Sequence, residues 1–226
     1  MECMLACNRQ LEDVKLLAVT KTHSVETIRT ALENGIEYIA ESKVQEAEQK
    51  IPKLVDCYKE FHFIGHLQTN KINKLLSLKP ILIHSIDKFS TAEKLNQASR
   101  NINRTQDILI EVNTSCEDNK NGVNPKDLSE LIRQIDDLEY IKVKGLMTIG
   151  ANTIDEKCIR KCFIKLRELF EKEKGKNHYS TQMLVLSMGM SSDFKIAIEE
   201  GSNILRLGSV LFGEREYNKR EVNVNG

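Results

Sequence analysis

Hydrophobic residues in this chain gather in short runs, and between the runs they recur three or four residues apart on otherwise polar stretches. Short apolar runs are typical of buried parallel strands, and the wider spacing is typical of helices that bury one face. The pattern predicts eight strands, in chain order at residues 15–20, 36–40, 61–65, 81–86, 107–113, 140–147, 182–187 and 203–208.

The stretches between the predicted strands carry single apolar stripes, which predict helices that pack on a sheet. Eight strand–helix units in 226 residues favour an α/β fold with a closed (β/α)8 barrel, the TIM barrel, over an open doubly wound sheet. No linker or repeat divides the chain, so we expect residues 1–226 to form one domain, with a short N-terminal helix within 1–14 and a frayed polar tail at 218–226. Four of the stripes are Val25, Ile28, Ala31 and Leu32; Val44, Ala47, Ile51 and Leu54; Leu128, Leu131, Ile132 and Ile135; and Cys158, Ile159, Cys162, Phe163, Leu166 and Phe170.

Charge and composition exclude several classes of partner. The 33 acidic and 33 basic residues cancel to a formal net charge of zero, so the chain lacks the broad positive field that attracts nucleic acid or acidic membranes. No apolar run approaches the roughly 20 residues that span a bilayer, and the start of the chain does not resemble a secretory signal. We therefore expect a soluble, cytoplasmic protein with no nucleic-acid or membrane partner. Its six cysteines lack paired motifs and are interpreted as reduced core residues, and no histidine spacing indicates a metal site.

In a TIM barrel the chemistry collects where the strands end and the loops begin. The predicted strand ends of this chain are rich in polar and reactive groups, so we expect the functional site there. The residues concerned are Lys21, His23, Glu41, Ser42, His66, Gln68, Asn70, Ser85, Asp87, Asn113, Met147, the run 187–193, Arg206, Gly208 and Ser209.

Lys21 follows the first predicted strand and shares its face with Leu17 and Val19, so the two-residue alternation of a strand directs it into the barrel. A half-buried amine loses part of its hydration, which favours the neutral form that attacks an aldehyde and forms a Schiff base. The alternative, which spacing alone favours, is a strand-end lysine that reaches water or pairs with a carboxylate such as Glu41.

Two loops offer backbone amides to an anion. The run 191–193 precedes a helical stripe that starts at Phe194, which predicts a helix N-cap with free amides. Gly208 and Ser209 follow the last predicted strand, and the loops after strands seven and eight are a recurrent phosphate site in such barrels. The alternative is an ordinary helix cap and an ordinary turn.

Arg206 shares a face of the last predicted strand with Ile204 and Gly208, which places a permanent charge inside the barrel mouth. Such a charge requires a planar or anionic partner. The alternative is an internal ion pair with Glu111, which likewise places a charged side chain within a predicted strand.

Seven segments of the chain, in order, resemble the pyridoxal phosphate homeostasis protein family, also called the YggS-like family. The resemblance extends from Leu16 to about Tyr217, and the number of ordered motifs makes it highly specific. The segments are LLAVTKT (16–22), VQE (44–46), HFIGHLQTNK (62–71), HSID (84–87), GLM (145–147), LSMGMSSD (186–193) and RLGSVLFG (206–213).

The resemblance implies the barrel of the alanine racemase N-terminal domain, in which Lys21 carries pyridoxal 5′-phosphate as a Schiff base. Arg206 is implied to face the pyridine nitrogen, and the serine- and glycine-containing loops are implied to hold the phosphate. An arginine does not keep the ring nitrogen protonated as a carboxylate does, so the electron sink is weak and transamination is disfavoured. The full implied set of cofactor-binding residues is Lys21, Ser42, Met190, Ser191, Ser192, Arg206, Gly208 and Ser209.

Two features depart from the family pattern. Ser42 stands where family members usually have an asparagine, so a side-chain contact to the cofactor from this position is shorter. The opening helix is also shorter than in the family, with residues 2–9 left to cover the bottom of the barrel.

The resemblance favours a carrier or regulator over a dedicated enzyme. A two-base racemase needs a second acid or base opposite the lysine, which alanine racemase takes from an additional domain of its partner subunit, and no strand-end tyrosine supplies one here. We therefore expect a monomer that binds pyridoxal phosphate, maintains its intracellular homeostasis and passes it to recipient apo-enzymes. The alternative is a weak pyridoxal-phosphate-dependent amino-acid racemase or lyase with Lys21 as its base.

Overall fold

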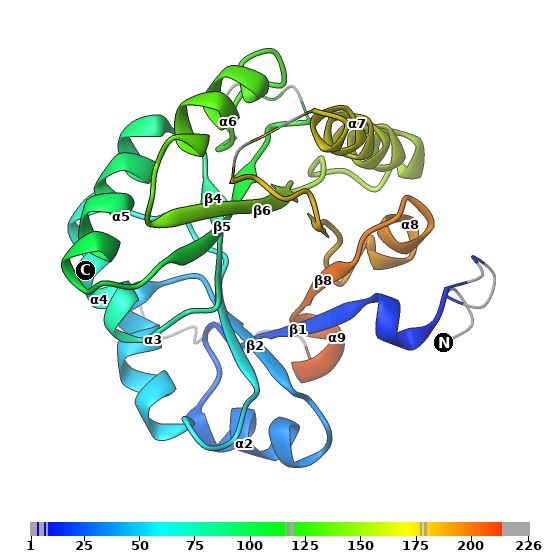
Figure 1. Ribbon diagram of the computed structural model, residues 1–226. Helices are drawn as coiled ribbons and strands as arrows, with labels where there is room; N and C mark the ends of the chain where they lie inside the picture. Colours follow the sequence, from blue (N-terminus) through cyan, green and yellow to red (C-terminus); the bar gives the residue numbers. More distant parts are fainter. Residues whose placement is uncertain are drawn as a thin grey trace, which may run out of the picture.

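The computed structural model describes residues 4, 7, 9–115, 117, 120–176, 178 and 180–213. Within these residues eight parallel strands close into a barrel in chain order, and the last strand is hydrogen-bonded back to the first (Figure 1). The closed barrel is confirmed, and each of the eight predicted strands overlaps an observed one, although the strand predicted at 182–187 begins only at Val185. The strands are β1 (Lys15–Val19), β2 (Tyr38–Glu41), β3 (Glu60–Phe63), β4 (Leu82–Ile86), β5 (Gln106–Glu111), β6 (Ile141–Met147), β7 (Val185–Ser187) and β8 (Ile204–Leu207).

A helix follows each strand, and the helices surround the barrel (Figure 1). The four predicted apolar stripes fall on α2, on α3 with η2, on α6 and on α7, so these predictions are confirmed too. The α-helices are α2 (Val25–Glu33), α3 (Val44–Lys50), α4 (Ile72–Ser77), α5 (Phe89–Asn101), α6 (Leu128–Asp136), α7 (Glu156–Lys174), α8 (Phe194–Glu199) and α9 (Ser209–Phe212), and the short 3-10 helices are η1 (Leu11–Asp13), η2 (Ile51–Lys53) and η3 (Thr69–Lys71).

The strand predicted at residues 36–40 begins two residues later, because Ile36 is part of the C-terminal cap that follows α2. Gly35 has φ +95°, and the amides of Gly35 and Ile36 donate to Leu32 O and Ala31 O at 3.1 and 3.2 Å. This is a Schellman motif, in which an apolar residue after the glycine packs back on the core. The hydrophobicity of Ile36 therefore reflects the end of a helix and not the start of a strand.

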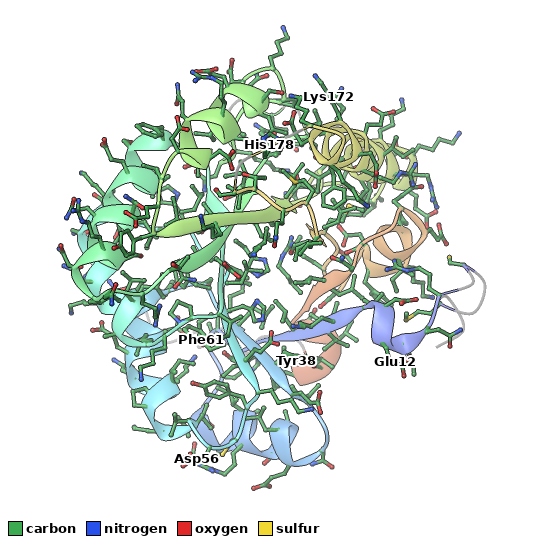
Figure 2. The ribbon with its side chains drawn as sticks, viewed as in Figure 1. Glu12, Tyr38, Asp56, Phe61, Lys172 and His178 are labelled. Carbon is green, nitrogen blue, oxygen red and sulfur yellow. The ribbon has the colours of Figure 1, made fainter. Side chains whose placement is uncertain are left out.

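Apolar side chains form two layers, one inside the barrel and one between the strands and the helices (Figure 2). The outer layer is the larger and includes Phe61 and Phe63 on one face of β3. Polar side chains complete the interior, among them the buried His62 and His84. The buried apolar residues of the inner layer are Leu17, Ala40, Leu82, Leu109, Met147 and Ile204.

The seam of the barrel is the pairing of β1 with β8. Lys15 pairs with Ile204 and Leu17 pairs with Arg206 in parallel register. A Cβ atom added to Gly208 would lie 3.7 Å from the Cβ of Val19, so the two strand ends stay in contact just below the loops. The seam therefore places the residues that follow β1 beside those that follow β8.

Some predictions concern the ends of the chain. The predicted frayed tail at 218–226 lies outside the described residues, as do 1–3, 5, 6 and 8 of the predicted N-terminal helix. Of the described residues there, Met4 is buried and η1 leads directly into β1.

No helix among the described residues is long and apolar enough to cross a membrane. The described cysteines, Cys7, Cys57, Cys158 and Cys162, are free thiols.

Candidate functional site

A cavity of about 580 Å³ opens at the carboxyl ends of the strands. All eight residues that the sequence assigns to cofactor binding line it, so the structure brings them together; their individual roles toward a ligand stay predictions. These residues are Lys21, Ser42, Met190, Ser191, Ser192, Arg206, Gly208 and Ser209. The remaining lining residues are Val19, Lys43, Ile64, Gly65, His66, Glu111, Asn121, Met147 and Ile149.

Lys21 lies two residues past the end of β1 and is half-buried, as its strand alternation predicts. The turn that follows is sharp, because Thr22 has φ +69° and its amide donates to Glu46 Oε2 at 2.8 Å. On the other side Thr20 donates from its hydroxyl to Glu41 Oε1 at 2.8 Å. Lys21 is thus held between two anchored neighbours at the rim of the cavity.

The carboxylate of Glu41, considered from the sequence as a partner of Lys21, is paired with Lys50. Lys50 Nζ lies 2.8 Å from Glu41 Oε1 and 2.9 Å from Glu46 Oε2, and it donates to the Thr20 carbonyl at 2.9 Å. Burial raises the pKa of Glu41, and the hydrogen bond from Lys50 acts in the opposite direction. Lys50 therefore ties the end of β1 to the end of β2 beneath the site.

The serine-rich loop after β7 supports the start of α9. Ser191 Oγ accepts hydrogen bonds from the amides of Gly208 and Val210 at 3.2 and 3.3 Å. The predicted cap of the next helix is correct in position, since α8 begins at Phe194 after Asp193, but Asp193 Oδ1 accepts from the Met190 amide at 2.5 Å and does not cap α8 with its side chain. Hydroxyls and amides from the loops after β7 and β8 therefore meet at one corner of the cavity.

Gly65 allows two loops to approach each other at the cavity wall. A Cβ atom at this position would lie 1.8 Å from the Ser42 carbonyl oxygen, which is an impossible contact. The Gly65 carbonyl in turn accepts a hydrogen bond from the Ser85 hydroxyl. The position of Ser42 is therefore set by backbone packing against the loop after β3.

Arg206 is only 4% exposed and lies on the face of β8 that lines the cavity. Its Nη1 donates to Ser187 Oγ and its Nη2 donates to the Thr148 carbonyl, both at 2.8 Å. The direct ion pair with Glu111 considered from the sequence is not formed: both residues are described, and no guanidinium nitrogen lies within 4.0 Å of a Glu111 carboxylate oxygen. Burial lowers the pKa of Arg206 to about 10, which leaves the guanidinium charged at neutral pH.

Glu111 is a lining residue that was not in the predicted cofactor-binding set. It ends β5 and is buried, and burial raises its pKa to about 7, with the charge of Asp87 adding to the rise and Arg206 opposing it. The alternation of β5, with Leu109 in the inner core, is the sequence signal that directs Glu111 into the barrel mouth. The cavity thus holds a carboxyl group that titrates near neutral pH.

The cavity combines three kinds of chemistry. A half-buried amine reacts with carbonyl compounds, clustered hydroxyls and amides suit an anion, and a buried guanidinium suits a planar or anionic acceptor. Across the part of the chain that the structure describes, no three His, Cys, Asp or Glu side chains are arranged to hold a metal ion.

The fold and the site together define a TIM barrel of the alanine racemase N-terminal domain type, and the model of that family matches residues 5–216. Curated relatives carry the name pyridoxal phosphate homeostasis protein. The relative from Aquifex aeolicus is 43% identical over 203 residues, which are 90% of this chain and 88% of the relative. The relative from Schizosaccharomyces pombe is 38% identical over 212 residues, 92% and 86% of the two chains. The chain belongs to the alanine racemase N-terminal domain family and, within it, to the pyridoxal phosphate homeostasis proteins, which confirms the predicted family.

Solved structures agree with this assignment. PipY from Synechococcus elongatus, solved with PLP bound, matches with a TM-score of 0.83 and 30% identity over 94% of this chain and 99% of PipY. A protein of unknown function from Bifidobacterium adolescentis matches with a TM-score of 0.88 and 34% identity over 93% and 89% of the two chains. Alanine racemase from Clostridium difficile matches with a TM-score of 0.74 at 15% identity, over 96% of this chain and 56% of that one, so this likeness concerns the barrel alone.

Proposed function

We propose that this chain binds pyridoxal 5′-phosphate in the cavity at the barrel mouth and acts in the intracellular homeostasis of that cofactor, as a carrier or regulator. The observation that carries the proposal is the convergence of an amine, a cluster of anion donors and a buried guanidinium on one cavity of about 580 Å³. These groups match the aldehyde, the phosphate and the ring nitrogen of the cofactor. The names of the relatives and the PLP-bound structure of PipY support it.

The donor set at the β7–β8 corner fits a phosphate. Ser191 already binds the amides of Gly208 and Val210, which holds the corner together. Ser192 and Ser209 are exposed hydroxyls on the same cavity, and Gly208 contributes no side chain that would occupy the space. Charge-assisted hydrogen bonds from such donors to phosphate oxygens are among the strong ones.

Arg206 supplies a fixed positive group toward the ring. When bound, the cofactor brings a reactive aldehyde and an electron-withdrawing pyridine ring. An arginine opposite the ring nitrogen donates a hydrogen bond but provides no carboxylate to keep that nitrogen protonated. The site therefore holds the cofactor without strongly activating it, which suits storage and delivery to recipient apo-enzymes.

The test is an absorption spectrum of the purified protein with pyridoxal phosphate, followed by borohydride reduction and mass mapping of the modified peptide. We expect a reduced adduct on Lys21 that is lost in Lys21→Ala. Lys43→Ala is the matched control, because Lys43 lines the same cavity but is exposed, and it should keep the adduct. Folded wild-type protein with no adduct on Lys21 would contradict the proposal.

The second candidate function is a weak amino-acid racemase or lyase. Glu111 favours it, because β5 lies opposite β1 in the ring of eight strands and Glu111 lines the same cavity as Lys21. A carboxyl group with a pKa near neutrality can give and take protons at physiological pH. Solvent deuterium entering the α-carbon of an amino acid faster than with free cofactor, and slowed in Glu111→Gln, would establish this activity over a pure carrier.

A further inference from the structure

A chain of hydrogen bonds crosses the interior of the barrel and ends on Arg206. We call it the interior relay. It starts at the amino ends of β1 and β3, and one of its links joins β4 to β7, which are not neighbours in the sheet. The relay runs from Lys15 Nζ to Glu60 Oε2 (2.5 Å), from Glu60 Oε2 to His62 Nε2 (2.9 Å), from His62 Nδ1 to His84 Nε2 (3.0 Å), from His84 Nδ1 to Ser187 Oγ (3.1 Å) and from Ser187 Oγ to Arg206 Nη1 (2.8 Å).

The acid end of the interior relay determines the direction of its hydrogen bonds. The hydrogen bond from His62, helped by Lys15, lowers the pKa of Glu60 to about 2, so Glu60 is a carboxylate that only accepts. His62 must therefore carry its proton on Nε2. Burial lowers the pKa of His62 and keeps the ring neutral, so its Nδ1 is an acceptor.

The same assignment of donors and acceptors continues from His62 through His84 and Ser187 to the cavity. His84 must donate from Nε2 to His62, and because burial lowers its pKa well below the usual range, its Nδ1 accepts. His84 Nδ1 accepts a hydrogen bond from the Ser187 hydroxyl, so the lone pairs of Ser187 Oγ remain free to accept from Arg206. Ser187 is fully buried, so no solvent competes for these bonds.

We propose that Glu60 is a positioning residue for Arg206: its carboxylate orders every hydrogen bond of the interior relay and so presents Arg206 with a fixed acceptor on Ser187. The guanidinium is then held at two points, Ser187 Oγ and the Thr148 carbonyl. The inference rests on the proposed function, in which Arg206 meets the cofactor ring. Glu60 itself begins β3 at the opposite end of the barrel and is not among the residues that line the cavity.

Replacing Glu60 by glutamine removes the constraint on direction. A side-chain amide can accept from His62 Nε2 or donate to it, so both directions become available. In the reversed relay each imidazole carries its single proton on Nδ1, His84 donates to Ser187, and the Ser187 hydroxyl proton turns elsewhere. The proton count does not change. Ser187 Oγ then accepts one hydrogen bond from His84 and one from Arg206, so the direction of the lone pair that Arg206 meets changes.

The test on the cofactor-free protein is a long-range proton–nitrogen correlation spectrum of histidine side chains. We expect His62 and His84 of the wild type to be protonated on Nε2 alone at neutral pH. Glu60→Gln should give mixed tautomers at His84, and Glu37→Gln should not. Glu37 is the matched control, because it lies directly before β2 at the same end of the barrel where Glu60 begins β3, and it too pairs with a lysine, Lys59. A wild-type histidine protonated on Nδ1, or an unchanged His84 in Glu60→Gln, overturns the inference.

Lys15→Met distinguishes two causes of a tautomer change: the loss of the Glu60 carboxylate as an obligatory acceptor, and the loss of the ion pair between Lys15 and Glu60. It removes the lysine but keeps the carboxylate of Glu60 as the acceptor, so the tautomers should stay those of the wild type. A tautomer change in Lys15→Met as large as that in Glu60→Gln would assign the effect to the ion pair and overturn the role of Glu60. The wild-type spectrum remains decisive if Glu60→Gln does not fold.

The cofactor-bound readout is the absorption maximum and affinity of pyridoxal phosphate. We expect Glu60→Gln to shift the maximum and to weaken binding about tenfold, while Glu37→Gln matches the wild type. Mixed tautomers with unchanged cofactor spectrum and affinity would overturn the positioning role. If the wild type binds no cofactor, the proposed function fails, and the tautomer spectra still decide whether Glu60 orders the relay.

Discussion

Arg206 donates to the hydroxyl of Ser187 at 2.8 Å and forms no direct ion pair with Glu111, although the arginine and the glutamate line the same cavity. A guanidinium that donates only to neutral oxygens keeps its positive charge unneutralised and able to attract a ligand. The cavity floor therefore stays attractive to an anionic or electron-rich group, which a buried ion pair would have cancelled.

Arg206→Lys should destabilise the fold and weaken cofactor binding. A lysine has one ammonium group and cannot reach Ser187 Oγ and the Thr148 carbonyl together, and leaving a buried acceptor unpaired costs about 1–3 kcal/mol. Chemical denaturation measures the loss. Arg133→Lys on α6 is the control, because Arg133 is exposed and its ion pair with Glu130 is screened by solvent and contributes little to stability. Equal effects of the two substitutions would show that the buried contacts of Arg206 do not matter.

Glu111→Gln should remove a pH dependence of stability. The folded-state pKa of Glu111 is raised from 4.5 to about 7, so the folded protein binds this proton more tightly than the unfolded chain does. The wild type should therefore lose stability as pH rises from about 4.5 to about 7, by an amount on the order of 3 kcal/mol, and stay lower above that range. Unfolding free energies of both proteins across this range measure the difference. Parallel curves would contradict a perturbed Glu111.

Gly65→Ala should damage the site and the fold together. The added methyl group would overlap the Ser42 carbonyl oxygen, and such overpacking typically costs about 1–3 kcal/mol. Because Ser42 lines the cavity, affinity for pyridoxal phosphate should fall as well. Gly175→Ala is the control, since a Cβ there would meet its nearest atoms at an ordinary 3.7 Å. Titration of absorbance with cofactor and thermal unfolding report the two effects.

Lys50→Met should be the most destabilising of these changes. It leaves the carboxylate of Glu41 buried without its ammonium partner, and breaking a buried pair costs about 3–5 kcal/mol. The double variant with Glu41→Gln should recover part of the loss, because no buried charge then remains. Lys59→Met, which breaks the exposed pair with Glu37, should cost far less than Lys50→Met. A double variant no more stable than Lys50→Met would show that the unpaired charge is not the cause.

The barrel could be predicted from the chain because its signal is repeated. Each strand carries a short apolar run, and each helix carries one stripe, so single errors such as the one at Ile36 do not alter the architecture. The position of Lys21 was also predictable, because strand alternation decides which residues enter the barrel mouth.

The partners of the site residues were not predictable in the same way. The choice of Lys50 as the partner of Glu41 depends on the position of α3, and the capping of α9 by Ser191 depends on two loops meeting in space. The positions of His62 and His84 in the sequence do not indicate a relay, because the hydrogen bond that extends it to Ser187 joins β4 to β7 across the barrel. Such contacts have no fixed sequence spacing, whereas strands and helices do.

The seam between β1 and β8 joins the first strand of the barrel in chain order to the last. Lys21 lies beyond one side of this seam, and Gly208 and Ser209 lie beyond the other. A ligand that bonds to the Lys21 amine and contacts the loop at Gly208 and Ser209 links the two sides of this seam, and its binding free energy adds to the free energy needed to separate the two strands. Occupancy should therefore slow amide exchange at this joint more than elsewhere in the sheet. It also follows that a chain still on the ribosome, with its last strand unmade, has no finished place for the ligand.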